Sequence, residues 1–143
     1  MGEMKVFVVV DSNIFIFANI AEYPEQETAK EKLKWLINKS CTILVNPIIV
    51  SEVHYKLSRL LSAEEAYERT LKIISSGHVE YVPLGKGTVL KAIELSRSRK
   101  IRINDALIAQ HALDLNAEGL VTDNTKDFVK VEGLKVIKLR EDE

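Results

Sequence analysis

Cysteine is almost absent from this sequence, and its scarcity limits the chemistry open to the chain. Cys41 is the single cysteine among 143 residues, so an intrachain disulfide and a cysteine-rich zinc site are both excluded. The three histidines, His54, His78 and His111, are too dispersed to predict a zinc triad. A lone thiol suits a reducing compartment, and we therefore expect a cytoplasmic protein.

The chain also lacks a long hydrophobic run and an excess of charge of either sign. The apolar run at 6–10 ends at Asp11, which makes it too short for a membrane span. Lysine plus arginine total 20 and aspartate plus glutamate total 21, for a formal net charge of -1. We therefore expect no membrane partner, and any nucleic acid must be bound by local basic patches.

The apolar content, 46% of residues, is sufficient for one domain with a single core across residues 1–143, of which 140–143 are expected to fray. Strands are predicted at 5–10, 42–45, 79–82, 120–122 and 134–139. A short apolar turn at 14–18 follows the first strand, and helical patterns cover 24–39, 47–60, 62–76, 85–99 and 104–116. This alternation predicts an α/β fold with three α/β/α layers, a central parallel sheet of four to five strands and a Rossmann-like topology.

Acidic residues recur where these strands end or where helices begin. Asp11 directly follows the first strand, and Asp123 follows the fourth. Glu52 lies toward the core-facing side of a helix, and Asp105 lies at the start of an apolar one. Ligands of open parallel sheets bind beyond the carboxyl ends of the strands. The four side chains are therefore predicted to converge at one edge of the sheet.

Each of these acidic residues also has an ordinary structural explanation. Asp11 could cap a helical turn, and Glu52 could pair with Lys56 one turn along its helix. Asp105 complements a helix dipole, and Asp123 suits an Asx-turn. These separate roles do not predict clustering at one edge, so their shared location favours a common site.

Converging carboxylates require a counter-charge. Two unit charges 4 Å apart repel by ~4 kcal/mol at an effective dielectric constant near 20. Either some of the carboxylates hold protons or a cation is bound. Oxygen ligands prefer Mg²⁺ or Mn²⁺, as one ion or two. Water activated by such a metal can attack a phosphodiester in line, so the pattern indicates a metal-dependent nuclease.

Three segments carry a resemblance to a known family: VVVDSNIFIF, NPIIVSEVHYKL and INDALIAQHALDLNAEGLVTDNTKDFVKVEGLKVIKL. Together they resemble the PIN domain, and especially the VapC toxins of prokaryotic toxin–antitoxin pairs, over essentially the whole chain. The resemblance implies that an acidic quartet is both catalytic and metal-binding, at Asp11, Glu52, Asp105 and a fourth position for which Asp123 is favoured. The supporting residues that it implies are Ser12, Asn13, Thr122, Asn124 and Asp127, and the last two are alternatives for the fourth position.

The resemblance further implies an endonuclease for single-stranded RNA that depends on Mg²⁺ or Mn²⁺, forms a homodimer and is held inactive by a small antitoxin protein. Two alternatives stay open. One is a catalytically silent module that binds RNA or protein, although a silent site has no reason to keep four repulsive charges. The other is an RNA-processing nuclease without an antitoxin.

A basic cluster precedes Asp105 and consists of Arg97, Arg99, Lys100 and Arg102. These side chains are candidates for contacts with RNA phosphates. Cations at the C-terminal end of the helix at 85–99 explain the cluster at least as well.

Overall fold

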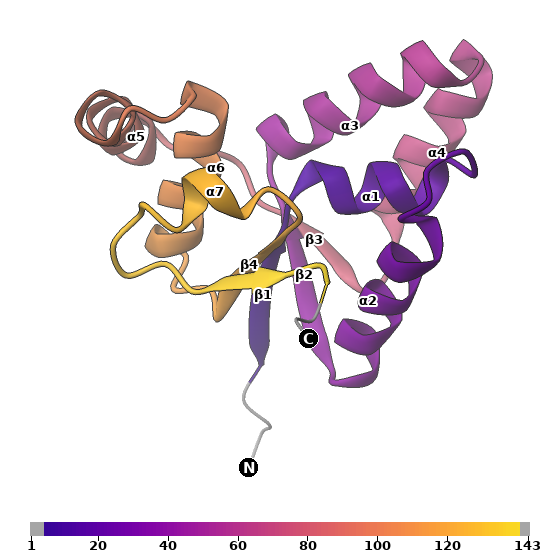
Figure 1. The fold of residues 1–143 in the computed structure, drawn as a ribbon, viewed down its shortest axis with the longest axis horizontal. Coiled ribbons are helices and arrows are strands. Elements are labelled where there is room, and N and C mark those ends of the chain that lie inside the picture. Colours follow the sequence, from indigo (N-terminus) through magenta and orange to yellow (C-terminus); the bar gives the residue numbers. More distant parts are fainter. Residues whose placement is uncertain (1–4, 141–143) are drawn as a thin grey trace.

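Five parallel strands form one sheet in the computed structural model, which describes residues 5–140 (Figure 1). The strands are β1 (Val6–Val10), β2 (Cys41–Val45), β3 (Val79–Tyr81), β4 (Gly119–Thr122) and β5 (Val136–Lys138), in the order β3-β2-β1-β4-β5. The chain builds outward from β1 through β2 to β3 and then returns to the other side of β1 with β4. The two directions meet between β1 and β4, which is where such sheets bind ligands.

Helices flank the sheet on both sides, so the predicted three-layer α/β/α fold is confirmed. Figure 1 shows α1 to α4 gathered on one side and α5 and α6 on the other. The helices within the described residues are α1 (Ser12–Asn19), α2 (Gln26–Asn38), α3 (Pro47–Leu60), α4 (Ala63–Ser75), α5 (Lys86–Arg99), α6 (Ile103–Asp114) and α7 (Thr125–Phe128). Across residues 5–140, no helix has the length and apolar character needed to cross a bilayer.

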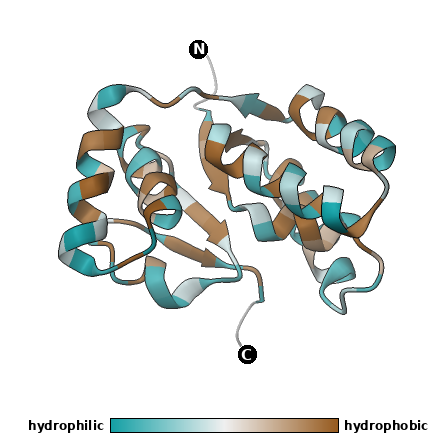
Figure 2. Cartoon of the chain, turned by 90° about the horizontal axis from the view of Figure 1, so that it is seen from above, coloured by the Kyte–Doolittle hydropathy of each residue, from teal (hydrophilic) through white to brown (hydrophobic). Residues whose placement is uncertain are grey.

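The core lies along the central strands. Val8, Val9 and Val10 of β1 are at most 2% exposed, and every residue of β4 is buried. Both faces of these strands are covered, which explains why their sequences are continuous apolar runs and not alternating ones. Figure 2 shows apolar residues on the strands and polar ones on much of the outer helix surface.

Capping residues define the starts of α3 and α4. The side chain of Asn46 accepts a hydrogen bond from the backbone N–H of Ile49 at 2.9 Å, and Pro47 is the first residue of α3. Ser62 and Glu65 form a capping box at the start of α4. These local signals fix where the two helices begin.

Two segments differ from the sequence expectations. Residues 14–18, expected as a short turn, belong to the helix α1, in which residues on several sides are buried. An all-round apolar pattern gives no helical period, so the sequence could not define this helix. Arg140 pairs with Glu25 at 2.8 Å and with Asp123 at 3.3 Å, although fraying was expected from this residue onward. The rest of the expected tail, 141–143, lies outside the described residues.

Gly119 allows β5 to lie close to β4. A Cβ atom added to Gly119 would lie 2.9 Å from the carbonyl oxygen of Lys135 and 2.8 Å from Cδ1 of Ile137. The Lys135 carbonyl cannot withdraw freely, because it accepts the N–H of Leu120 at 2.9 Å. In contrast, a Cβ atom at Gly87, in α5, meets nothing within 4 Å.

We therefore expect Gly119→Ala to lower the free energy of unfolding by about 1–3 kcal/mol, because the added methyl group forces the two strands apart. The matched variant Gly87→Ala should raise it by up to about 1 kcal/mol, because alanine favours a helix over glycine. Urea denaturation of both variants measures the two effects. Equal stability of Gly119→Ala and the wild type would contradict the close approach of β4 and β5.

Candidate active site

Asp11 lies where β1 ends and α1 begins, and its carboxylate is held on both oxygens. Oδ1 accepts the backbone N–H of Ser12 at 2.8 Å. Oδ2 accepts the hydroxyl of Thr122, at the end of β4, at 2.7 Å and the amide of Asn13 at 3.3 Å. The residue is only 4% exposed. Asp11 is thus a helix cap and also a buried carboxylate at the β1–β4 junction.

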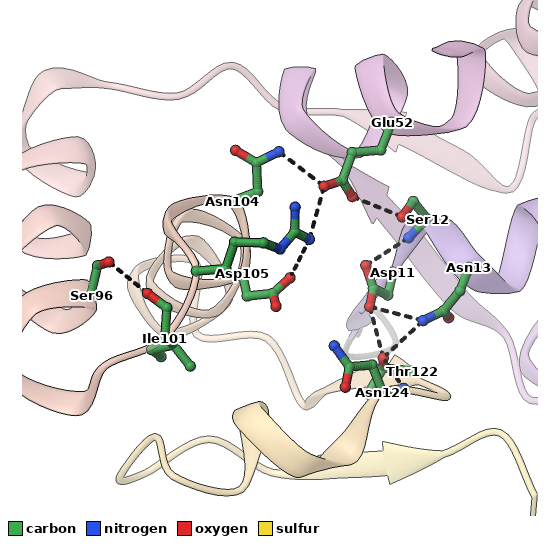
Figure 3. A network of polar contacts seen from close by, with 11 residues as sticks. Asp11, Ser12, Asn13, Glu52, Ser96, Ile101, Asn104, Asp105, Thr122 and Asn124 are labelled. Carbon is green, nitrogen blue, oxygen red and sulfur yellow. Dashed lines mark hydrogen bonds and ion pairs between the residues drawn. The ribbon is translucent and has the colours of Figure 1, made fainter. Parts of the chain in front are cut away.

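Glu52 of α3 and Asp105 of α6 join the same network (Figure 3). Oε1 of Glu52 accepts the hydroxyl of Ser12 at 2.8 Å, and Oε2 accepts the amide of Asn104 at 3.0 Å. A single nitrogen of Arg102, Nη2, donates to Oε2 of Glu52 at 3.2 Å and to Oδ1 of Asp105 at 2.9 Å. These contacts of Glu52 cross the site, whereas the alternative pairing with Lys56 would have run along its own helix.

The three carboxylates influence one another electrostatically. Burial raises the pKa of Asp11 from 3.8 to about 6; hydrogen bonds from Thr122 and Ser12 oppose this, and the charges of Glu52 and Asp105 add to it. Burial likewise raises the pKa of Asp105, against the opposing effect of Arg102. The structure therefore joins residues 11, 52 and 105 in one acidic cluster, and their catalytic and metal-binding roles stay predictions.

The fourth acidic position involves the segment after β4. The backbone N–H of Asp123 donates to Oδ1 of Asn13 at 3.3 Å, while its carboxylate accepts Nε of Arg140 at 3.3 Å. The backbone N–H of Asn124 donates to the hydroxyl of Thr122 at 2.9 Å, and Figure 3 shows Asn124 beside Thr122.

Asp127, on α7, is the third candidate for this position. Its carboxylate pairs with Lys130 at 3.2 Å. Its charge also helps to raise the pKa of Asp105, so Asp127 is electrostatically coupled to the acidic cluster.

Of the basic cluster, Arg102 is the member that contacts the acidic site among the contacts described for 5–140. Arg97 pairs with Glu94 on its own helix. Arg99 lies 3.9 Å from Glu132. Lys100 ends α5 in the left-handed conformation, with φ of 57°. These three residues lie at or near the C-terminal end of α5, as the alternative explanation of the cluster requires.

Asn104 and the bridging role of Arg102 were not predicted from sequence. Asn104 was seen only as the residue before Asp105, and Arg102 only as a possible phosphate ligand. Both roles depend on Glu52, which is about fifty residues away along the chain. The only sequence signal for these roles was that both residues are polar and lie close to Asp105 in the chain.

The family profile of the PIN domain matches residues 8–134. The chain belongs to the PIN domain family. Solved PIN-like structures of toxin–antitoxin proteins share its fold. VapBC2 of Rickettsia felis, bound to a promoter DNA fragment, has a TM-score of 0.74 and 26% identity over 93% of this chain and 98% of that chain. VapBC-1 of nontypeable Haemophilus influenzae has a TM-score of 0.73 and 21% identity over 94% of this chain and 98% of that chain.

A third structure, the sarcin-ricin loop cleaving toxin VapC20 of Mycobacterium tuberculosis, has a TM-score of 0.66 and 15% identity over 79% of this chain and 86% of that chain. A comparison with curated proteins found no match. The resemblance noted in the sequence is therefore confirmed at the level of family and fold.

The carboxylates of this PIN domain have the ligand chemistry that a hard divalent cation needs, but in this structure they are not placed to bind one together. Asp11, Glu52 and Asp105 offer the oxygen ligands that Mg²⁺ and Mn²⁺ prefer. Nevertheless, within the described part of the chain no three His, Cys, Asp or Glu side chains are placed to hold a metal ion together. The guanidinium of Arg102 lies between two of the carboxylates. A metal held by both carboxylates would therefore compete with Arg102 for them.

A cleft of about 550 Å³ opens beside Glu52. Its lining includes Ser12, Tyr55, Lys56, Arg102 and Asn104. Tyr55 is 62% exposed. Glu52 is thus accessible from a cleft that carries two cationic side chains and one aromatic side chain.

Asp11→Asn is expected to stabilise the metal-free PIN domain at neutral pH. The unfolded chain loses the Asp11 proton near pH 3.8 and the folded chain near pH 6, so the free energy of unfolding falls as pH rises between these values and stays lower above them. The difference between these two pKa values corresponds to roughly 3 kcal/mol of lost stability, which Asp11→Asn regains. The hydrogen bonds that the variant weakens reduce this gain. We expect the free energy of unfolding of Asp11→Asn to exceed that of the wild type by about 1–2 kcal/mol at neutral pH. Below the ordinary aspartate pKa we expect no difference.

Denaturant unfolding in EDTA, at neutral and at acidic pH, measures this difference. Loss of stability in Asp11→Asn at both pH values would contradict the raised pKa of Asp11.

Proposed function

We propose that this protein is a divalent-metal-dependent endoribonuclease that cuts single-stranded RNA in the cytoplasm, as the toxin of a toxin–antitoxin pair. The observation that carries the proposal is the meeting of Asp11, Glu52 and Asp105, from three separate elements, in one network where β1 and β4 end. Membership of the PIN family supports nuclease activity. The structural neighbours, which include VapBC toxin–antitoxin proteins, support an antitoxin partner.

The acidic cluster would hold one or two Mg²⁺ or Mn²⁺ ions through Asp11, Glu52, Asp105 and a fourth acidic residue. Such a metal supplies charge neutralisation at the phosphate and an activated water. The chain's own polar groups set the ligands in place. Thr122 and Asn13 orient Asp11, and Ser12 and Asn104 orient Glu52. Hydrogen bonds of this kind hold carboxylates in the rotamers that ligand binding needs.

Each of the two aspartates pairs with a cation, Asp123 with Arg140 and Asp127 with Lys130, so these ion pairs do not separate them. The charge of Asp127 acts on Asp105. This coupling supports Asp127 as the fourth acidic group, in preference to Asp123, which the sequence favoured, and to Asn124, which carries no charge.

An RNA substrate is supported by the chemistry of the cleft and by one structural neighbour. Lys56 and Arg102 can contact phosphates, and the exposed ring of Tyr55 can stack on an unpaired base. VapC20 of Mycobacterium tuberculosis is described as cleaving the sarcin-ricin loop. A homodimer, which the resemblance implies, stays a prediction.

A nuclease for RNA processing without an antitoxin is the second candidate, and a silent binding module is the third. The neighbouring reading frame distinguishes the first two. A short gene for a DNA-binding antitoxin beside this one supports the toxin role, whereas its absence favours RNA processing. Cleavage by the purified protein excludes the silent module.

The purified protein is expected to cut single-stranded RNA with Mn²⁺ or Mg²⁺ and to stop when EDTA is added. Asp11→Asn should lower the cleavage rate by at least about 100-fold, because the site loses a metal ligand. Glu64→Gln, at an exposed position in the first turn of α4, is the control and should retain the wild-type rate. Cleavage of a fluorescent RNA oligonucleotide measures all three proteins. Unchanged activity of Asp11→Asn would reject the proposed site.

Asp127→Asn and Asp123→Asn form a matched pair, since each removes one carboxylate from the segment after β4. We expect Asp127→Asn to weaken Mn²⁺ binding by about tenfold and Asp123→Asn to change it by less than about threefold. Calorimetric titration with Mn²⁺ gives both affinities. If Asp123→Asn weakened Mn²⁺ binding more than Asp127→Asn, the fourth position would be assigned to Asp123.

A further inference from the structure

Arg102 joins two carboxylates that the proposed function assigns to a metal. Its Nη2 atom lies 3.2 Å from Oε2 of Glu52 and 2.9 Å from Oδ1 of Asp105. The two acidic residues come from different helices, α3 and α6. Their side chains are only 19% and 4% exposed, whereas that of Arg102 is 58% exposed. A largely exposed cation thus reaches inward to two largely buried anions.

The guanidinium occupies the region that a shared metal ion would need. A divalent cation bound jointly by Glu52 and Asp105 would compete with Arg102 for these two carboxylates. Arginine keeps its charge at every pH that a protein tolerates, so Arg102 cannot give up these contacts by losing a proton. It can only move away, and positive charges that compete for the same anions bind at each other's expense.

Movement of Arg102 is physically accessible. Withdrawal of Arg102 alone would leave two largely buried carboxylates without a counter-charge, but a metal ion that binds in its place supplies that charge, and the exposed guanidinium can regain water. The displaced guanidinium also has space to enter, because Arg102 lines an open cleft beside Glu52.

We propose that Arg102 is a tethered counter-ion of the acidic site, which bridges Glu52 and Asp105 in the metal-free protein and is displaced when a divalent metal binds. The inference rests on the proposed function. Its consequence is that Arg102 lowers the metal affinity of the protein while it stabilises the metal-free fold. Metal binding and the release of one arginine side chain are then a single event.

Calorimetric titration of the metal-free protein with Mn²⁺ tests this competition. Arg102→Gln should bind Mn²⁺ about tenfold more tightly than the wild type, equivalent to about 1.4 kcal/mol. Arg102→Lys keeps the positive charge and should stay within about threefold of the wild type. Arg97→Gln removes an arginine that pairs with Glu94 on α5, and should leave the affinity unchanged. Equal or weaker binding by Arg102→Gln would overturn the proposal.

Thermal unfolding separates this role from a purely structural one. In EDTA, Arg102→Gln should melt at a lower temperature than the wild type. Saturating Mn²⁺ should raise the melting temperature of Arg102→Gln by more than it raises that of the wild type. A loss of stability that Mn²⁺ does not repair would mean that Arg102 serves only the fold.

A measurement on the unaltered protein covers the case in which the variant fails to fold. The Nε–Hε NMR signal of Arg102 should shift as Mg²⁺ is added, with the same midpoint as metal binding, while that of Arg97 stays in place. Metal binding with an unchanged Arg102 signal contradicts displacement.

Failure of the two proposals can be told apart. If the wild type and Arg102→Gln both fail to bind Mn²⁺, the metal-dependent nuclease is rejected together with the role of Arg102. If the wild type binds Mn²⁺ and cuts RNA while Arg102→Gln gains no affinity, only the counter-ion is rejected.

Discussion

The buried carboxylate of Asp11 is the constraint on which the site depends. It ends the central strand of the sheet at the junction with β4, and it is only 4% exposed. A charge in that position has to be compensated by donors, and these come from the start of α1 and the end of β4. Their compensation is incomplete, because the pKa of Asp11 is raised to about 6. The fold therefore carries an energetic cost at the point where its chemistry is expected.

Positive charge at the acidic cluster connects stability with function. Glu52 and Asp105 approach each other with Arg102 between them. Without a cation, the repulsion among three carboxylates would push α3 and α6 apart or keep protons bound. An arginine held by the chain meets this need in the metal-free protein. A metal ion would meet the same need with ligand chemistry suited to phosphodiester cleavage.

Several features followed from local sequence signals. The strands at 5–10 and 120–122 are continuous apolar runs, and the caps at Asn46 and Ser62 define two helix starts. The helix α1 was missed, because an all-round apolar segment has no period to read. The fourth acidic position was ambiguous for a different reason. Asp123, Asn124 and Asp127 all follow β4, and what separates them is how each lies relative to Asp105, whose pKa the charge of Asp127 helps to raise.

The sequence by itself determined the alternation of strands and helices, the family, and the placing of Asp11, Glu52 and Asp105 at strand exits and on helices facing one edge. The alternation and the placing follow from periodicity, capping and chain order, which are local or topological, and the family follows from the resemblance of three segments. Only the tertiary structure decided that one nitrogen of Arg102 would bridge two carboxylates and that Asn104 would hold Glu52. The two contacts with Glu52 join residues about fifty positions apart, and their geometry depends on how α3 packs against α6, which no local pattern encodes.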